Sequence, residues 1–253
     1  MLLAIDIGNT SISFGIFKGR KLVKTFRVGT EQCSVPTWAR FLAMTGKIDD
    51  AIICSVVPKL TPAIAKAIKQ MAGVSPIIIG KDINLPIKNK YKNPKQVGQD
   101  RLVDAIAAKE LYGAPAIVVD SGTAITFDYI SKNGDYEGGI IVPGIDISLK
   151  ALFERTALLP DVKLKDDKGL TLIGRDTVNS IKSGLLHGFG SLADGVINRL
   201  KAKYGNDIRV IGTGGYINFI KKYSNSIDII DEFLTLKGLC IIYEKKHLTS
   251  SRL

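Results

Sequence analysis

Apolar runs that end at polar corners organise the first half of the chain. Residues 2–5 form a short apolar run, and residues 11–17 alternate between apolar and polar positions. Alternation and short β-rich runs bounded by turn residues predict strands. The strands expected in this half cover residues 2–5, 11–17, 22–28, 51–56 and 77–79. Residues 80–99, rich in lysine and containing Pro and Gly, predict a loop.

Three helices are expected between these strands. Residues 35–44 have a helical pattern, and residues 61–73 carry signals at both ends. Thr61 is a suitable N-cap, Pro62 suits the first helical position, and Gly73 suits the end. Between them Ile64, Ile68 and Met71 share one face. The third helix starts at Asp100, turns Val103, Ile106 and Ala107 inward, and closes at Gly113.

The second half repeats this order. Strands are expected at residues 116–119, 125–130, 137–142 and 208–211, and a last helix at residues 236–244. Asp176 or Thr177 caps a long helix that runs to about Tyr204. Gly184, Gly188 and Gly195 would each weaken an isolated helix by roughly 1 kcal/mol, so their presence predicts close backbone packing.

Each half therefore reads strand-strand-strand-helix-strand-helix, with a boundary near residues 113–115. This pattern predicts a duplicated α/β ribonuclease H-like fold of the actin, hexokinase and Hsp70 type, with a cleft between domains 1–114 and 115–253. The chain has neither a G-x-G-x-x-G after the first strand nor a P-loop, so a Rossmann or P-loop fold fits less well.

The two halves also share a chemical corner. Asp6-Ile7-Gly8-Asn9-Thr10 and Asp120-Ser121-Gly122-Thr123 each place an acid, a glycine and small polar residues after an apolar strand. The acid can hold a cation or a water, and the glycine lets the backbone approach an anion. An ordinary turn explains one such corner, but the second copy favours a grip on a nucleotide polyphosphate. The turn Thr213-Gly214-Gly215 suits an adenosine-binding edge.

A second candidate for chemistry is Val97-Gly98-Gln99-Asp100-Arg101. Asp100 alone reads as a helix cap. With Arg101 beside it, the pair suits transfer of phosphate to an alcohol: the acid orients the hydroxyl and accepts its proton, and the guanidinium pairs with an anion. His187 and His247 have no nucleophile or acid around them in the sequence and are expected to be structural or exposed.

The net charge of +11 over 253 residues leaves two readings open. It fits an anionic partner or a solvated basic surface, and we favour the second because the basic residues are dispersed. Cys33, Cys54 and Cys240 lack metal-ligand spacing and predict reduced thiols. No run approaches a membrane span and residues 1–5 are too short for a signal-peptide core, so a cytoplasmic protein is expected.

Taken together, the motifs resemble the type III pantothenate kinase family over residues 1–245. They are D-I-G-N-T, G-Q-D-R, D-S-G-T-A-I-T, G-G-I-I-V-P-G, T-A-L-L-P, G-x-D-T, T-G-G and L-T-L-K-G-L, in the family's order. The resemblance implies phosphorylation of pantothenate by ATP, the first step of coenzyme A synthesis. Ser121 and Ile125 stand where relatives often carry an aromatic residue and Thr, and Tyr216 where Leu is common.

The resemblance also implies roles for individual residues. It makes Asp100 the general base, with Arg101 beside it, and makes Asp120 the ligand of a monovalent cation, K⁺ or NH₄⁺. Mg²⁺ would lie near Asp6, directly or through water. With the adenosine edge included, the expected ATP-binding residues are Asp6, Gly8, Asn9, Thr10, Ser11, Ser13, Thr123, Gly214 and Gly215. The expected pantothenate-binding residues are Tyr91, Gly98, Gln99, Asp100, Arg101 and Thr177.

Thr177 would reach pantothenate across a dimer interface, so the resemblance implies a homodimer. Neither a membrane nor a nucleic acid is expected as a partner. Two alternatives stay open: a kinase of the same fold that acts on another small alcohol, and a non-catalytic ATP-binding transcription accessory factor. Intact Asp6, Asp100 and Asp120 argue against the second.

Overall fold

The computed structural model describes residues 1–32, 46–164 and 169–250 of the chain. The chain forms two compact units. Unit 1 comprises Met1–Tyr112, Gly134–Tyr136 and Phe233–Leu253, and unit 2 comprises Gly113–Asn133 and Glu137–Glu232. The chain thus returns to unit 1 twice after residue 112. The division into ribonuclease H-like halves at residue 114 stays a prediction about the sequence repeat.

Unit 1 is built on a five-stranded mixed sheet in the order β3-β2-β1-β4-β5. Its strands are β1 (Leu2–Ile7), β2 (Ser11–Lys18), β3 (Lys21–Gly29), β4 (Asp50–Ser55) and β5 (Ile77–Ile78). β2 pairs antiparallel with both β1 and β3, whereas β4 pairs in parallel with β1 and β5 in parallel with β4. The expected strands of the first half are therefore confirmed.

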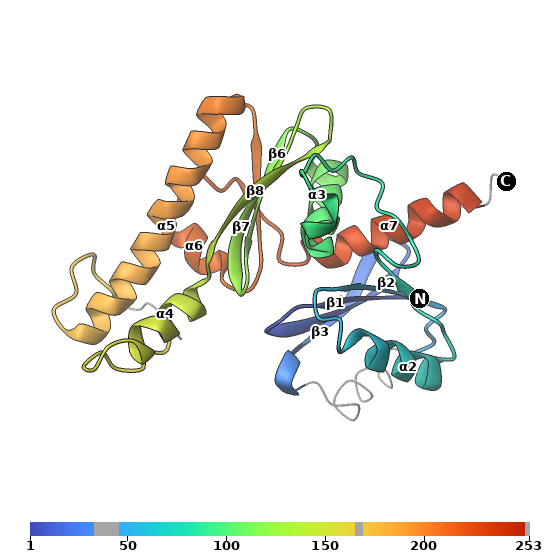
Figure 1. The fold of residues 1–253 in the computed structure, drawn as a ribbon, viewed down its shortest axis with the longest axis horizontal. Helices are drawn as coiled ribbons and strands as arrows, with labels where there is room; N and C mark the ends of the chain where they lie inside the picture. The colour runs from blue at the N-terminus through green and yellow to red at the C-terminus, as the bar shows by residue number, and fades with distance from the viewer. Residues whose placement is uncertain (33–45, 165–168, 251–253) are drawn as a thin grey trace. The chain divides into compact units, whose positions relative to one another are not determined.

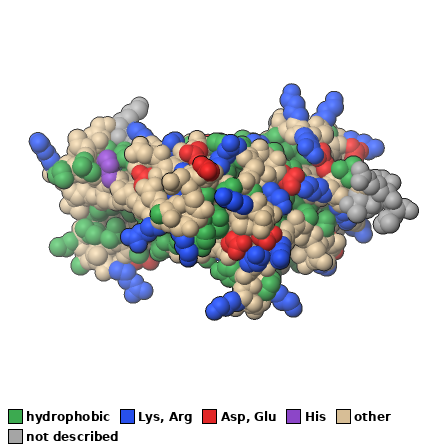
Figure 2. All heavy atoms as spheres, turned by 90° about the horizontal axis from the view of Figure 1, so that it is seen from above, with side chains coloured by type: hydrophobic (Ala, Val, Ile, Leu, Met, Phe, Trp, Pro, Cys, Tyr) green, Lys and Arg blue, Asp and Glu red, His purple; other side chains and the backbone are tan. Residues whose placement is uncertain are grey.

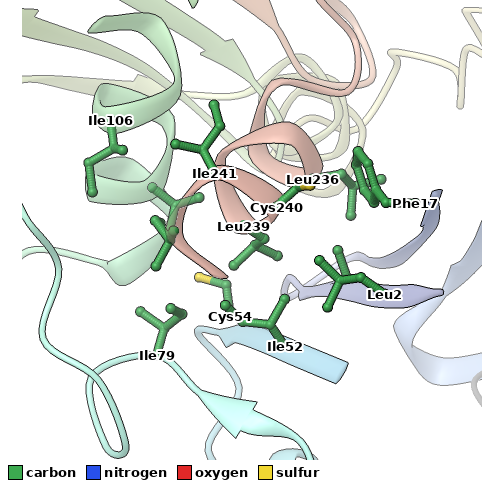
Figure 3. Packing of buried hydrophobic residues seen from close by; sticks show 13 residues of the cluster. Leu2, Phe17, Ile52, Cys54, Ile79, Ile106, Leu236, Leu239, Cys240 and Ile241 are labelled. Carbon is green, nitrogen blue, oxygen red and sulfur yellow. The ribbon is translucent and has the colours of Figure 1, made fainter. Parts of the chain in front are cut away.

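Alternating residues of β1 give this sheet two apolar faces. Leu3 and Ile5 pack with Ile64 and Ile68 of α2 (Thr61–Ala72) in one core. Leu2 and Ala4 belong to the core on the opposite face, together with residues of α3 (Gln99–Tyr112) and α7 (Leu234–Ser250). Figure 3 shows α7 residues projecting onto the strands, and Figure 1 shows α7 beside α3.

Unit 2 repeats the strand order of unit 1. Its sheet is ordered β10-β9-β6-β7-β8. Read from β8, this is the order of unit 1: the third, second and first strands, and then the fourth and fifth. The strands are β6 (Ala116–Ser121), β7 (Ala124–Ile130), β8 (Tyr136–Pro143), β9 (Arg209–Thr213) and β10 (Ile229–Ile230). As in unit 1, the first strand pairs antiparallel with the second and parallel with the fourth. The duplicated α/β fold is confirmed.

The described residues of unit 2 also form three helices. They are α4 (Ile145–Glu154), α5 (Thr177–Tyr204) and α6 (Ile217–Tyr223), and Figure 1 shows α6 next to the long α5. Residues of α4, α5 and α6 bury Ile117, Val119 and Phe127 of the sheet in one core. Two short 3₁₀ turns lie outside these elements, at Thr30–Gln32 and Pro94–Gln96 in unit 1.

Several local expectations were wrong. Leu60, not Thr61, is the N-cap of α2, because Thr61 already has helical geometry and its hydroxyl bonds Ser55 at 2.8 Å. Met71 is 43% exposed and does not share the buried face.

Asp176 is confirmed as the N-cap of α5, and its carboxylate accepts from the Asn179 amide at 2.9 Å. The expected helix at residues 35–44 lies outside the described residues.

The glycines of α5 also differ from expectation. Gly184, Gly188 and Gly195 are exposed, and a Cβ on any of them would meet no described atom within 4 Å. Gly190 makes the close approach instead, since a Cβ there would run into the backbone of Tyr223, the last residue of α6. One glycine of α5, which the sequence analysis did not single out, thus sets the spacing between α5 and α6.

Asp194 fastens the end of α6 to α5. Its carboxylate accepts hydrogen bonds from the Ser224 hydroxyl at 2.6 Å and from the backbone amides of Asn225 and Ser226 at 3.0 and 2.9 Å. Burial raises the pKa of Asp194, but these hydrogen bonds outweigh burial and leave that pKa below its usual value. The same contacts hold α6, which follows the turn Gly214-Gly215, in place.

We expect Asp194→Asn to lower the free energy of unfolding by about 1–2 kcal/mol at pH 7, because the carboxylate accepts several hydrogen bonds. A depressed folded-state pKa gives stability that is present above the unfolded value of about 3.9 and lost as pH falls through the folded value. Urea unfolding curves should therefore converge with those of the wild type below about pH 4. Asp207→Asn, at an exposed turn before β9, is the control. Equal unfolding of both variants at pH 7 would contradict this role.

Candidate active site

The first acid-and-glycine corner is the turn between β1 and β2 in unit 1. The Gly8 amide donates to the Ser11 carbonyl at 3.0 Å, and the Thr30 hydroxyl donates to the Gly8 carbonyl at 2.7 Å. Asn9 and Thr10 at the tip are exposed, whereas Asp6 at the end of β1 is half-buried. The turn is thus held rigidly from below while its tip stays accessible to a ligand.

Arg27 is a neighbour of this turn that the sequence analysis missed. Its guanidinium donates from Nε at 3.0 Å and from Nη2 at 2.8 Å to the Ser11 hydroxyl. The cross-strand pairing of β2 with β3, which places Arg27 opposite Ser13, brings it there. That register cannot be read from the β3 sequence alone. An exposed cation therefore lies at the turn predicted to hold phosphate.

Three carboxylates, of which one is buried, lie near the buried thiol of Cys54 beneath this corner. Burial raises the pKa of the Cys54 thiol well above its usual value, and the nearby carboxylates of Asp6, Asp100 and Asp104 raise that pKa further. Cys54 lies opposite Asp6 in the β1–β4 register. The structure thus brings Asp6 and Asp100, predicted from separate motifs, around one thiol. Asp104, one turn beyond Asp100 on α3 and 2% exposed, was not predicted.

Side chains of α3 lie close to two glycines of the segment before it. A Cβ on Gly98 would collide with Oδ1 of Asp100, and a Cβ on Gly80 would come within 3.1 Å of the Gln99 side chain. Oδ1 of Asp100 accepts from the Arg101 amide at 2.8 Å, as expected of an acid in the first turn of a helix. Gly98 thus leaves room for the Asp100 carboxylate, and Gly80 leaves room for the Gln99 side chain.

Tyr136 connects two of the residues predicted to bind pantothenate. The Arg101 guanidinium lies 5.9 Å from the centre of the Tyr136 ring, and the Tyr91 ring lies 6.4 Å from it. The Tyr136 backbone accepts from the Lys90 amide and donates to the Lys88 carbonyl, both at 2.9 Å. Tyr136 is fully buried and follows the turn at Asn133-Gly134. The sequence predicts the turn at Asn133-Gly134. It does not show that the residue after this turn pairs with the loop that contains Lys88 and Lys90.

In unit 2 the second corner and two other glycines converge. A Cβ on Gly144 would come closer than 3.0 Å to the carbonyls of Gly122 and Thr123, and the Gly144 amide donates to the Thr123 carbonyl at 3.2 Å. A Cβ on Gly214 would collide with the carboxylate of Asp120 and the backbone of Ser121. The structure therefore brings the motifs around Asp120, Gly144 and Gly214 together.

Tyr216 ties α4 to α6 beside these turns. Its amide donates to the Ser121 carbonyl at 3.1 Å, and its hydroxyl donates to Oδ1 of Asp146 at 2.5 Å. Burial and the Asp146 carboxylate raise the pKa of Tyr216, so the hydroxyl stays protonated and donates at neutral pH. Asp146, in the first turn of α4, was not among the predicted residues because the sequence gives no sign that α4 and α6 begin side by side.

The remaining predicted residues lie apart from these contacts. Thr177 is the exposed first residue of α5. His187 packs against the Tyr223 ring at 4.4 Å and His247 against the Tyr243 ring at 4.3 Å, in agreement with structural roles. Among the described residues no group of three His, Cys, Asp or Glu residues could hold a metal ion.

The face of the molecule seen in Figure 2 carries no single block of like charge. Figure 2 shows Lys and Arg side chains scattered over the visible face, with acidic side chains among them. No described helix is both long and apolar enough to cross a membrane. The chemistry available is therefore that of two glycine corners with acids at their strand ends, which can hold phosphate and cations, and of the Asp100–Arg101 pair.

The fold defines the class of two-domain α/β proteins with a ribonuclease H-like, actin- or hexokinase-type architecture. Over its full length the chain superposes with a TM-score of 0.56 and 12% identity on 97% of a Clostridium difficile activator of 2-hydroxyisocaproyl-CoA dehydratase with bound ADPNP. A Campylobacter jejuni protein described as a Baf family transcriptional activator matches with a TM-score of 0.62 and 22% identity, over 97% of this chain and 99% of that one. Both likenesses concern the fold.

The chain belongs to the type III pantothenate kinase family, whose family model matches residues 2–199. It is 41% identical to the type III pantothenate kinase of Geotalea uraniireducens over 98% of this chain and all of that one. It is 43% identical to that of Finegoldia magna over 96% of each chain. The resemblance predicted from the motifs is confirmed.

The contacts of Tyr136 give a prediction for unit 1. We expect Tyr136→Leu to raise the KM for pantothenate about tenfold with a smaller change in the KM for ATP, because the ring that supports Arg101 is lost. Tyr136→Phe keeps the ring and should restore most of the affinity. Steady-state kinetics of both variants test this, and equal KM values for pantothenate in wild type and Tyr136→Leu would contradict it.

Proposed function

We propose that this protein phosphorylates pantothenate with ATP to give 4'-phosphopantothenate, the first step of coenzyme A synthesis. The observation that carries the proposal is membership of the type III pantothenate kinase family, with the family's motifs at structured positions in both units. The same membership favours pantothenate over another small alcohol, and it favours a phosphotransferase over a transcription accessory factor.

In the proposed reaction the primary alcohol of pantothenate attacks the γ-phosphorus of ATP in line, through a loose transition state. Little proton transfer is needed early, so a carboxylate of ordinary basicity can serve. Asp100 orients the hydroxyl and takes its proton late. Arg101, supported by the Tyr136 ring, pairs with the pantothenate carboxylate or with the transferring phosphoryl group. Gly98, Gln99 and Tyr91 complete the pantothenate site.

The phosphates of ATP are assigned to the glycine corners. Backbone amides and hydroxyls of a turn that lacks side-chain bulk suit an anion. In unit 1 these groups come from Gly8, Asn9, Thr10, Ser11 and Ser13, and in unit 2 from Thr123, with Gly214 and Gly215 at the adenosine edge. The exposed tips at Asn9, Thr10 and Thr123 support the assignment, because a phosphate must reach them from solvent.

The carboxylate oxygens at the two corners would suit two cations. Mg²⁺ and K⁺ prefer oxygen ligands, and the half-buried carboxylates of Asp6 and Asp120 each stand at the end of a strand beside a glycine turn. Asp6 would hold Mg²⁺, directly or through water, and Asp120 would hold K⁺ or NH₄⁺. Bound there, the cations neutralise phosphate charge, while the protein residues orient the reactants.

We also propose that the protein acts as a homodimer through unit 2. Three apolar side chains of this unit are largely exposed: Leu158 at 91%, Leu172 at 66% and Ile173 at 75%. On α5, the exposed Gly184 and Gly188 lie one turn apart and carry no side chain. Thr177 at the start of the same helix would then reach the pantothenate of the partner. Gly188→Arg should shift the mass measured by light scattering from dimer to monomer, whereas Lys203→Glu, near the end of α5, should not. A monomeric wild type would contradict the proposal.

Asp100→Asn tests the assigned base. We expect pantothenate-dependent ADP release, measured with Mg²⁺ and ATP, to lose two to four decades in kcat, the usual effect of removing a general base. ATP binding should change much less, because Asp100 is assigned to the alcohol. Equal loss of ATP binding would mean that Asp100 is structural, and no ADP release by the wild type would contradict the proposed function itself.

Asp120→Ala tests the cation site. The wild type should be stimulated by K⁺ or NH₄⁺, and the variant should show no stimulation, because the carboxylate that holds the cation is gone. The measurement is the ADP-release rate across a series of KCl concentrations, with choline chloride holding the ionic strength constant. Undiminished stimulation of the variant would place the cation elsewhere.

A further inference from the structure

Arg27 places a positive charge at the first acid-and-glycine corner. Its side chain is exposed, and its guanidinium donates two hydrogen bonds to one neutral group, the Ser11 hydroxyl. None of the described acids forms an ion pair or a hydrogen bond with this guanidinium. A guanidinium has five N–H donors, so three remain for a ligand. Its planar fork suits phosphate, because it can bond two oxygens at once.

The sheet register places Arg27 in one row with the acid of this corner. Arg27 of β3 is opposite Ser13 of β2, Ser13 is opposite Asp6 of β1, and Asp6 is opposite Cys54 of β4. Neighbouring strands lie about 4.8 Å apart, so about 10 Å separates the Cα atoms of Arg27 and Asp6. A phosphate chain above Ser13 would therefore have a guanidinium on one side and the carboxylate assigned to Mg²⁺ on the other.

This row faces the side of the sheet on which α3 lies. Cys54 belongs to the core that α3 and α7 cover. Phe26 and Val28, the neighbours of Arg27 on β3, pack on the opposite core, which α2 covers. Because side chains alternate along a strand, Arg27 points to the face of α3. α3 carries Asp100, the assigned general base, in its first turn, so the row and the base share one face of the sheet.

The hydrogen bonds from Arg27 also determine what Ser11 can do. A hydroxyl has two acceptor lone pairs and one proton to donate. The two N–H groups of Arg27, at 3.0 and 2.8 Å from the Ser11 oxygen, occupy both lone pairs. Ser11 is therefore left with its proton as a donor, and no described atom accepts it. An ionised phosphate oxygen, which only accepts hydrogen bonds, would complete the bonding of both residues.

We propose that Arg27 binds the phosphate chain of ATP and sets the Ser11 hydroxyl to donate to the same chain. The proposal rests on the proposed use of ATP and deepens it, because it adds a cationic side chain to a corner assigned only neutral donors and a metal ion. The chain has no P-loop and therefore no P-loop lysine. Arg27 supplies the positive charge that such a lysine places on the phosphates.

Arg27 can be replaced without removing the support of the turn. Thr30 holds the turn backbone, because its amide donates to the Thr10 carbonyl at 3.0 Å and its hydroxyl to the Gly8 carbonyl at 2.7 Å. The Arg27 guanidinium is exposed and bonds only the Ser11 side chain. Urea unfolding of Arg27→Met should therefore match that of the wild type, which separates ligand binding from folding.

The first test measures binding of ADPNP with Mg²⁺ to the full chain by titration calorimetry. Arg27→Met should weaken binding about tenfold or more, because charge-assisted hydrogen bonds to phosphate are lost. Arg27→Lys keeps the charge without the fork and should recover part of the affinity. Lys21→Met removes the same charge at the exposed opposite end of β3 and should bind like the wild type. Unchanged binding by Arg27→Met, or equal losses in Arg27→Met and Lys21→Met, would overturn the proposal.

The second test asks whether Arg27 also acts through Ser11. Ser11→Ala should weaken ADPNP binding several-fold. The double variant should lose less than the product of the two single losses, because the two residues act as one unit. Losses that multiply would overturn the positioning of Ser11 by Arg27.

Steady-state kinetics separate this proposal from the proposed function. In Arg27→Met the KM for ATP should rise about tenfold and the KM for pantothenate by less than about twofold. Equal rises would mean that Arg27 only supports the fold of unit 1, and would overturn the proposal. ADPNP binding that depends on Arg27, without pantothenate-dependent ADP release, supports the phosphate role and contradicts the proposed function. Turnover that Arg27→Met leaves unaffected does the reverse.

Discussion

Close backbone packing at two glycines holds the candidate nucleotide site of unit 2 together. Gly144 lies against the carbonyls of Gly122 and Thr123, and Gly214 lies against the carboxylate of Asp120, with no room for a Cβ at either position. Because these three segments come from distant parts of the sequence, their packing converts separate turns into one surface. The starts of α4 and α6 then lie side by side, so that Tyr216 can reach Asp146.

Unit 1 assembles its site by a different means. There the sheet register and α3 bring the carboxylates of Asp6, Asp100 and Asp104 around the buried Cys54 thiol. The tip of the β7–β8 hairpin packs into the same unit, and its Tyr136 ring supports Arg101 and Tyr91. The two units thus share a strand order but differ in the residues beside their corners: carboxylates, Arg101 and the Tyr136 ring in unit 1, and closely packed glycine turns in unit 2.

The sequence predicts those parts of this structure that depend on local pattern. The strands, the N-cap at Asp176 and the two acid-and-glycine corners follow from alternation and turn residues. The contacts of Arg27, Tyr136 and Asp146 could not be predicted, because each depends on cross-strand register or on the packing of segments far apart in sequence. Likewise the helical glycines of α5 look alike in sequence, yet only Gly190 contacts a neighbouring backbone in the described part of the chain.

The most direct measurement of the central claim is ADP binding by Gly144→Ala, followed by titration calorimetry. One methyl group there would push Gly122 and Thr123 from their positions, and the account predicts loss of ADP binding while the protein stays folded by circular dichroism. Gly195→Ala adds the same methyl group where no described atom lies within 4 Å, and should bind ADP like the wild type. Undiminished ADP binding by Gly144→Ala would contradict the account.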